Sequence, residues 1–323
     1  MPHLLVAGKL HPAGVALLDE LKARGVTFDY VEEISEPSYA PLIDKADALV
    51  IRTQPLSAAT IAKAARLKVV SRHGVGYDAV DLDALNARGI ALTIVGDVNS
   101  VSVAEHAMMQ LLAAAKQILR ADRAVRDPSH WNWRNRLEQR EIHGKNLLIV
   151  GYGRSGRHLA RMASGFDMKV RAHDPFLKKA GWPEGDVASF DDLSEGLAWA
   201  DCLSVHVPKS DRPVIGEKEL RAVKPGIIIA NTARGGVIDE RALAQALADG
   251  RVNAAGIDVF EQEPPTDESP FLSQDNAILS PHIAGVTEEA AMRMAISSIE
   301  NAIGFLEGNI DPALIVNRKS ANA

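Results

Sequence analysis

The sequence predicts an α/β protein with two doubly wound, Rossmann-like domains, each built on a parallel sheet. Three observations support this fold class. Short β-rich runs alternate with helical patterns along the chain, as in successive βαβ units. A polar, basic segment at Arg123–Gly144 interrupts the alternation once, and a second βαβ series follows it. The length of 323 residues is long for one domain and sufficient for two hydrophobic cores.

The first series of predicted elements precedes residue 100. A helix is expected at His11–Arg24, because Val15, Leu18 and Leu21 recur at helical spacing. Short apolar or alternating runs predict five strands, at Leu4–Ala7, Val26–Glu32, Ala48–Arg52, Lys68–Ser71 and Ile90–Ile94.

A long apolar helix and an irregular segment separate the two series. Val101–Ala121 predicts one helix, mostly apolar and therefore buried at a junction. The following segment Arg123–Gly144 carries Trp131 and Trp133, two residues apart. Exposed Trp and Arg side chains are common at protein interfaces, which favours a homodimer contact here. Packing of both Trp side chains on their own domain is an equally weighted alternative.

The second series resumes the βαβ rhythm and ends in an amphipathic helix at Glu288–Leu306. Its strands are expected at Lys145–Val150, Lys169–His173, Cys202–Val207, Gly226–Asn231, Asn253–Val259 and Ala277–Leu279.

Composition and charge exclude several classes of function. The net charge of −6 argues against a nucleic-acid or anionic-membrane partner, but a local basic site can still bind a small anionic substrate. The only cysteine, Cys202, lies in an apolar predicted strand, so neither a disulfide nor a cysteine metal site is expected. The ten histidines show no metal-ligand spacing, and no metal is expected. The N-terminus reads as a first strand and not as a leader, so the expected location is cytoplasmic.

A glycine-rich loop predicts a dinucleotide site. Asn146–Val150 predicts a strand, and the residues that follow have the pattern G-x-G-x-x-G with Gly151, Gly153 and Gly156. A helix is expected to begin near Arg157. In this arrangement the first glycine permits the tight turn, the second lets the backbone approach a pyrophosphate, and the third lets the helix pack on the strand. The helix N-terminus then offers free N–H groups to the phosphates.

Asp174 strengthens this prediction and indicates which cofactor binds. It follows the next strand at the distance expected for a carboxylate that holds the ribose hydroxyls. A carboxylate at this point would repel a 2′-phosphate, so NAD is favoured over NADP. Lys178 and Lys179 lie nearby, and we interpret them as solvated surface charges.

Three loops in the second half carry the candidate catalytic residues Arg234, Glu263 and His282. Each loop follows a predicted strand, and the carboxyl ends of parallel strands meet at the edge where open α/β sheets bind ligands. Arginine can hold a carboxylate and polarise a neighbouring oxygen. Histidine can take up and return a proton near neutral pH, and a carboxylate can fix its tautomer. The three residues together are suited to oxidising a hydroxy acid.

These motifs resemble the D-2-hydroxyacid dehydrogenase family along nearly the whole chain. Asn231–Gly236, Asp258–Pro264 and Pro281–Gly285 are similar to its three catalytic signatures, in the same order. The resemblance implies that Arg234 binds the substrate, that Glu263 orients His282, and that His282 is the acid and base. It implies NAD contacts from Gly151, Gly153, Arg154, Ser155, Gly156, Asp174, His206, Val207, Pro208, Thr232, Ala233, Arg234, Asp258, His282 and Gly285.

The resemblance also implies a domain layout. Residues 1–99 plus 290–323 would form a flavodoxin-like substrate domain, and residues 100–289 would form the NAD-binding Rossmann domain. This layout is not apparent from spacing alone, because it requires the last helix to cross back to the first domain.

Within the family, the likeness is greatest to phosphoglycerate dehydrogenases that have no regulatory domain. It implies that the substrate contacts are Arg52, Arg72, His73, Gly74, Val75, Gly76 and Asn99. The chain departs from that pattern at Ala79, where asparagine is usual, at Ser155, where an apolar residue is common, at Lys209-Ser210, and at His73. Reduction of hydroxypyruvate or glyoxylate, or turnover of another D-2-hydroxy acid, therefore remains an alternative.

Other classes of protein fit the sequence less well. A formate dehydrogenase would carry glutamine in place of Glu263, and no Tyr-x-x-x-Lys pair of a short-chain dehydrogenase is present. A non-enzymatic NAD sensor, like the corepressors of the same family, is the competing hypothesis from another class. Such a corepressor needs a groove that binds a partner peptide, and we find no partner-binding motif in the sequence.

Overall fold

The computed structural model describes residues 1–185 and 187–318. The chain divides into two compact units, one formed by Met1–Asn99 with Val286–Ala323 and the other by Ser100–Gly285. Residues 186 and 319–323, which the expected domain ranges include, lie outside the described residues. No helix in the described part of the chain is long and apolar enough to cross a membrane.

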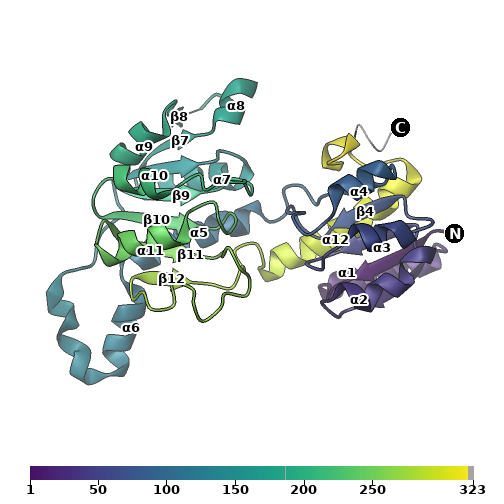
Figure 1. Cartoon of the computed structure of the whole chain (residues 1–323), viewed down its shortest axis with the longest axis horizontal. Helices are drawn as coiled ribbons and strands as arrows, with labels where there is room; N and C mark the ends of the chain where they lie inside the picture. The colour runs from purple at the N-terminus through teal and green to yellow at the C-terminus, as the bar shows by residue number, and fades with distance from the viewer. Residues whose placement is uncertain (186, 319–323) are drawn as a thin grey trace. The chain divides into compact units, whose positions relative to one another are not determined.

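The first unit contains a five-stranded sheet, and every neighbouring pair of its strands is parallel (Figure 1). The strand order β2-β1-β3-β4-β5 is the flavodoxin-like order of a doubly wound fold. The strands are β1 (His3–Ala7), β2 (Thr27–Val31), β3 (Ala48–Ile51), β4 (Val69–Arg72) and β5 (Ala91–Thr93).

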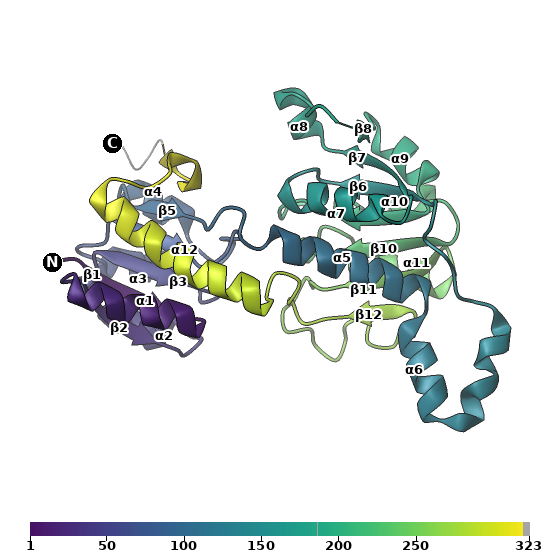
Figure 2. The same cartoon turned by 180° about the vertical axis from the view of Figure 1, so that it is seen from behind.

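Helices cover both faces of this sheet. On one face lie α1 (Pro12–Ala23) and α12 (Glu288–Glu307), which run side by side in front of the strands in Figure 2. Along β1, Leu4 and Val6 pack toward these helices, whereas Leu5 and Ala7 pack toward the opposite face. That face is covered by α2 (Glu36–Tyr39), η1 (Ala40–Lys45), α3 (Ala58–Lys63) and α4 (Leu82–Ala87), and the short η3 (Pro312–Leu314) follows α12.

The second unit contains a seven-stranded sheet, also parallel throughout. Its order, β12-β11-β10-β9-β6-β7-β8, extends the Rossmann order by one strand, so the predicted α/β fold class is confirmed. The strands are β6 (Asn146–Val150), β7 (Lys169–His173), β8 (Ala188–Ser189), β9 (Cys202–Val205), β10 (Ile227–Asn231), β11 (Val252–Ile257) and β12 (Ala277–Leu279).

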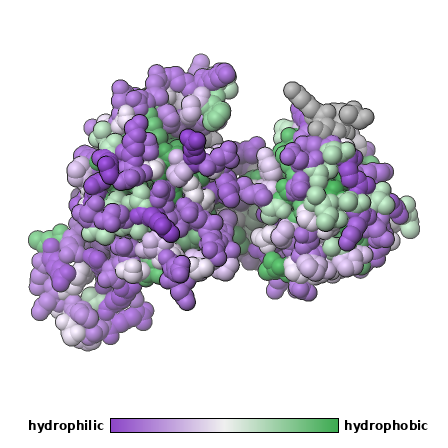
Figure 3. Space-filling view, in the orientation of Figure 1, coloured by the Kyte–Doolittle hydropathy of each residue, from purple (hydrophilic) through white to green (hydrophobic). Residues whose placement is uncertain are grey.

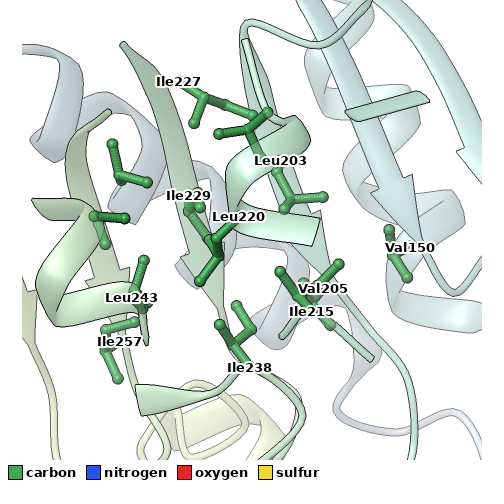
Figure 4. Close-up of a cluster of buried hydrophobic side chains, with 14 of the residues drawn as sticks. Val150, Leu203, Val205, Ile215, Leu220, Ile227, Ile229, Ile238, Leu243 and Ile257 are labelled. Atoms are coloured by element: carbon green, nitrogen blue, oxygen red, sulfur yellow. The ribbon is translucent and has the colours of Figure 1, made fainter. Parts of the chain in front are cut away.

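The core of the second unit has two layers. Figure 4 shows one of them, in which Leu203, Ile229 and Ile257 of the strands meet Leu220 and Leu243 of two covering helices. That face is covered by α9 (Leu193–Trp199), α10 (Glu217–Ala222) and α11 (Glu240–Ala248). The other face is covered by α5 (Ser100–Ala115) and α7 (Arg154–Ser164), while α8 (Pro175–Ala180) follows β7.

The prediction of a single helix at Val101–Ala121 is wrong. The helix α5 ends at Ala115, Gln117 adopts a left-handed φ of 51°, and a new helix, α6 (Ile118–Arg126), leads into η2 (Pro128–Arg136). We call residues 118–137 the arm. Both views show it extending away from the sheet of its own unit (Figures 1 and 2). The helix expected near Arg157 also begins earlier, at Arg154, because Gly153 is its N-cap.

Candidate active site

The glycine-rich loop connects β6 to α7, and each glycine has a different steric environment. Gly151 has a φ of +93°, and a Cβ there would lie 2.6 Å from the carbonyl oxygen of His206. A Cβ at Gly156 would lie 2.5 Å from the carbonyl oxygen of Gly151. A Cβ at Gly153 would meet nothing within 4 Å. The first and third glycines are therefore required by packing, whereas the space beside the second is open to a ligand.

Asp174 joins the end of β7 to this loop. One carboxylate oxygen accepts a hydrogen bond from the N–H of Tyr152 at 3.0 Å, and the other accepts one from the N–H of Leu177 at 2.8 Å. The ring of Tyr152 stacks on Trp182, with centroids 5.3 Å apart. Sequence reasoning missed Trp182, because a lone Trp in a loop has no spacing pattern.

The loops after β9 and β10 lie at the same edge of the sheet. Strand β9 is the neighbour of β6 on the side opposite β7, so the sheet reverses its winding beside the glycine loop. The N–H of His206 donates to the carbonyl of Val150 at 2.7 Å, which places His206, Val207 and Pro208 against that loop. After β10, the hydroxyl of Thr232 is buried and has no hydrogen-bond partner among the described residues.

Two of the catalytic loops are in direct contact. A Cβ at Gly235 would overlap the backbone of Phe260, so only glycine allows the loop after β10 to approach the loop after β11 this closely. In the first loop, Asn231 accepts a hydrogen bond from the N–H of Ala233 and donates one to the carbonyl of Arg234. These bonds hold the backbone that carries the Arg234 side chain.

Glu263 and His282 form a hydrogen-bonded pair. One carboxylate oxygen of Glu263 lies 2.7 Å from Nδ1 of His282, and the other accepts a hydrogen bond from the N–H of Phe260 at 3.0 Å. The side chains are 37% and 47% exposed, so both are accessible from solvent. Nδ1 of His282 is thus bonded to Glu263, and Nε2 takes no part in this hydrogen bond.

Electrostatics support an ionised Glu263. Burial alone would raise the pKa of this carboxyl group. The hydrogen bonds from His282 and from the N–H of Phe260, together with the charges of His282 and Arg234, outweigh burial and hold the pKa below its ordinary value. The charge of Arg234 thus acts on Glu263, whose carboxylate is hydrogen-bonded to His282, while the guanidinium of Arg234 donates to the carbonyl of Ala233.

The backbone of His282 is held in an unusual conformation. Its φ is +53°, and its N–H donates to the carbonyl of Asp258 at 2.8 Å. The fully buried carboxylate of Asp258 accepts hydrogen bonds from the hydroxyl of Ser280 and from the N–H groups of Ile283 and Ala284. Asp258 therefore fixes the loop that carries His282, and that loop ends at Gly285.

His106 and Gln110 of α5 also contribute to this loop, although the sequence did not identify them. Nε2 of His106 lies 2.9 Å from the hydroxyl of Ser280, and the side-chain amide of Gln110 donates to the same hydroxyl at 3.4 Å. Both residues lie on a long apolar helix far away in the sequence, so spacing could not connect them to His282.

The predicted substrate residues belong to the first unit: Arg52 follows β3, Arg72 ends β4 and precedes His73–Gly76, and Asn99 lies after β5. Arg52 donates to the carbonyl of Lys9, and Arg72 donates to the carbonyls of Ile51 and His73. His73 is 6% exposed, and burial, assisted by the charges of Arg52 and Arg72, lowers its pKa to about 4. Gly74, Val75 and Gly76 continue this loop, and Asn99 is the last residue of the first segment of the unit.

Comparison with known families gives a specific match. Residues 108–284 match the model of the D-isomer specific 2-hydroxyacid dehydrogenase, NAD binding domain. This range contains the glycine loop, Asp174 and all three predicted catalytic residues. The family resemblance inferred from the sequence motifs is confirmed.

Individual relatives match over most of the chain. A D-3-phosphoglycerate dehydrogenase of Mycobacterium bovis is 39% identical over 97% of this chain, which spans only 58% of that relative's length. A glyoxylate reductase of Korarchaeum cryptofilum is 34% identical, and the match covers 97% of this chain and 96% of the relative. Among solved structures, the TT0316 protein of Thermus thermophilus superimposes with a TM-score of 0.87 and 30% identity, covering 97% of this chain and 99% of that one.

Proposed function

The chain belongs to the D-isomer specific 2-hydroxyacid dehydrogenase family, and on this premise we propose that it catalyses NAD-dependent hydride transfer between a D-2-hydroxy acid and its 2-keto acid. The observation that carries the proposal is the 2.7 Å hydrogen bond between Glu263 and Nδ1 of His282, with Arg234 nearby. The pair provides a proton acceptor and donor at the sheet edge where the glycine loop lies.

The roles of the three residues follow from this geometry. Because Nδ1 of His282 is bound to an ionised Glu263, that nitrogen carries a proton and Nε2 is the one that exchanges a proton with the substrate hydroxyl. Glu263 also stabilises the imidazolium that forms when the hydroxyl proton is taken up. The guanidinium of Arg234 binds the substrate carboxylate and polarises the oxygen on C2.

The second unit has the features that an NAD site needs. Bound NAD supplies the hydride acceptor or donor. The open space at Gly153 suits a pyrophosphate, and the unpaired hydroxyl of Thr232 suits a ligand with polar groups. Asp174 lies beside the loop as expected for a ribose-binding carboxylate, so we expect NADH to be preferred over NADPH. The unit 100–285 is accordingly proposed as the NAD-binding domain.

The first unit, residues 1–99 with 286–323, is proposed as the substrate domain. Its cations Arg52 and Arg72 flank the buried His73, so this region suits an acid that carries a second anionic group. We therefore propose 3-phosphoglycerate and its keto acid as the substrate pair. Reduction of glyoxylate or hydroxypyruvate is the second candidate, and the match to a glyoxylate reductase over nearly its full length supports it.

We also propose that the protein acts in the cytoplasm as a homodimer in which the arm contacts a second copy of the chain. The arm exposes several large apolar side chains among polar ones, and in Figure 3 its surface, like that of the rest of this unit, is mainly hydrophilic with hydrophobic residues in small groups. Several exposed large apolar side chains on one projecting segment, together with Trp and Arg, are typical of interfaces. The exposed apolar residues are Ile118, Leu119, Val125, Trp131 and Leu137.

The proposed reaction is tested by following NADH oxidation with phosphohydroxypyruvate, hydroxypyruvate, glyoxylate and pyruvate. We expect turnover, with the highest kcat/KM for phosphohydroxypyruvate. The variant His282→Ala should lose about 10²–10⁴-fold in kcat, the usual contribution of a general acid or base, and should bind NADH as tightly as the wild type. His143→Ala, which removes an exposed histidine outside the site, is the matched control and should leave kcat unchanged.

The outcomes separate the competing hypotheses. Preference for glyoxylate or hydroxypyruvate would select the reductase. NADH binding without turnover of any keto acid would favour the NAD-sensor hypothesis, and unchanged turnover in His282→Ala would refute the proposed mechanism.

A further inference from the structure

A short chain of side-chain hydrogen bonds lies beneath the glycine loop. The hydroxyl of Ser155 lies 3.1 Å from Nδ1 of His206, and Nε2 of the same ring lies 2.8 Å from the hydroxyl of Ser204. Ser204 is a fully buried residue of β9, whereas Ser155 is partly exposed in the first turn of α7. One imidazole thus connects the core of the sheet to the helix N-terminus that faces the open space at Gly153.

The protonation state of the ring limits what this chain can do. Burial lowers the pKa of His206 to about 4, so the imidazole is neutral at neutral pH. A neutral imidazole donates from one nitrogen and accepts at the other, while each serine hydroxyl can do either. The three side chains can therefore be hydrogen-bonded in two directions.

The two directions leave Ser155 in different states. In the first, the hydroxyl of Ser155 donates to Nδ1, and Nε2–H donates to Ser204. In the second, the hydroxyl of Ser204 donates to Nε2, and Nδ1–H donates to the oxygen of Ser155. Only the second leaves the hydroxyl proton of Ser155 free for a ligand.

A pyrophosphate accepts hydrogen bonds but donates none, so it favours the second direction. We propose that the hydroxyl of Ser155 donates to the pyrophosphate of NAD, and that NAD binding thereby selects the Nδ1–H tautomer of His206. Ser155 is then a binding residue through its side chain, in addition to the backbone N–H groups of the loop. His206 and Ser204 are positioning residues that hold its hydroxyl in the donating orientation. This inference rests on the proposed binding of NAD in the second unit.

The first test measures NADH affinity by fluorescence titration. Ser155→Ala should weaken binding about 10-fold or more, the usual effect of losing a hydrogen bond to a charged group. Ser155→Thr keeps the hydroxyl and should bind NADH nearly as well as the wild type. Ser164→Ala removes a hydroxyl from the other end of the same helix, where it bonds to the carbonyl of Arg161, and should have no effect.

The second test reads the tautomer directly. Nitrogen NMR of protein labelled with ¹⁵N-histidine distinguishes a protonated from an unprotonated ring nitrogen, and His206→Gln identifies the signals. We expect Nδ1 of His206 to be the protonated nitrogen when NADH saturates the protein, and the Nε2–H tautomer to be significantly populated without it.

The possible failures are distinguishable. If the wild type does not bind NADH at all, the proposed cofactor site is wrong. If NADH binds but the tautomer is the same with and without it, or if Ser155→Ala binds as tightly as the wild type, the role assigned to Ser155 and His206 is wrong.

Discussion

Two histidines that the sequence singled out illustrate how local environment decides the role of a side chain. His282 is 47% exposed and bonded to a carboxylate, an environment that suits proton exchange with a substrate. His73 is buried beside Arg52 and Arg72, and its pKa is lowered to about 4. Buried in this way, His73 is neutral in the folded protein at neutral pH, so its pKa affects how the free energy of unfolding depends on pH.

The free energy of unfolding should fall as the pH drops from about 6.5 to about 4. The pKa of His73 is near 6.5 in the unfolded chain and about 4 in the folded one, so in this window the unfolded state binds more protons. Stability is therefore complete above the unfolded pKa and is lost as acid protonates the unfolded chain. The total contribution of this residue is on the order of 3 kcal/mol. Urea unfolding at a series of pH values measures it.

A variant pair isolates this effect from other titrating groups. His73→Asn should reduce the slope of stability against pH between about 6.5 and 4, whatever its stability at neutral pH, while the slope due to His206, whose pKa is also lowered to about 4, remains. His130→Asn removes an exposed histidine of the arm and should leave the slope as in the wild type. Equal slopes for all three proteins would contradict the lowered pKa of His73.

At the scale of elements, the β6–α7 connection shows that two glycines of one motif, Gly153 and Gly156, are required for different reasons. The Cβ of an alanine at Gly156 would lie 2.5 Å from a backbone carbonyl, but at Gly153 it would meet nothing. Gly153→Ala should therefore melt at nearly the wild-type temperature and lose NADH affinity at least about 10-fold, because the methyl group occupies space needed by the pyrophosphate.

Gly156→Ala should behave in the opposite way. The clash lies within the protein, so its melting temperature should fall by several degrees, as expected when a close-packed contact must open. Thermal denaturation and NADH titration of both variants check the pair. Loss of stability in Gly153→Ala with unchanged NADH affinity would show that the open space at this residue is not the pyrophosphate site.

The strands of both sheets except the two-residue β8 were predicted from the sequence, while β8 and the break between α5 and α6 were not. Strands buried on both faces are continuous apolar runs, such as Leu147–Val150, and these are visible in the sequence. The run Val101–Ala121 is equally continuous, but α5 ends at Ala115. The carbonyl of Ala115 accepts a hydrogen bond from the N–H of Arg140, where the chain returns from the arm. A contact between residues so far apart leaves no periodic trace in the sequence.

The candidate active site was likewise predictable from the sequence only in part. Parallel-sheet topology predicts that Arg234, Glu263 and His282 converge, because each follows a strand at one edge; Glu263 and His282 are in contact, and the charge of Arg234 acts on Glu263. The contacts that hold the His282 loop come from His106 and Gln110, and they depend on how α5 packs across the sheet. The carboxylate of Asp258 accepts hydrogen bonds from three protein donors. Its contact with NAD stays a prediction.

At the scale of the whole molecule, much of the arm is not covered by its own unit. None of the η2 residues is buried, and Leu137 and Val125 are 86% and 63% exposed. Burial of such side chains against a second copy would stabilise the dimer by about 1.5–3 kcal/mol for each large apolar residue. In a monomer these side chains stay exposed and contribute no free energy of burial. The proposed homodimer therefore predicts that charges placed on the arm separate the subunits without unfolding them.

The double variant Val125→Glu with Leu137→Glu should sediment as a monomer at a protein concentration where the wild type sediments as a dimer. Because both side chains are exposed in the single chain, the circular dichroism spectrum should not change. Phe176→Glu is the matched control, since Phe176 is also 86% exposed but lies on α8, outside the arm, and this variant should remain dimeric. A wild type that sediments as a monomer would refute the homodimer, and a double variant that stays dimeric would place the contact elsewhere on the chain.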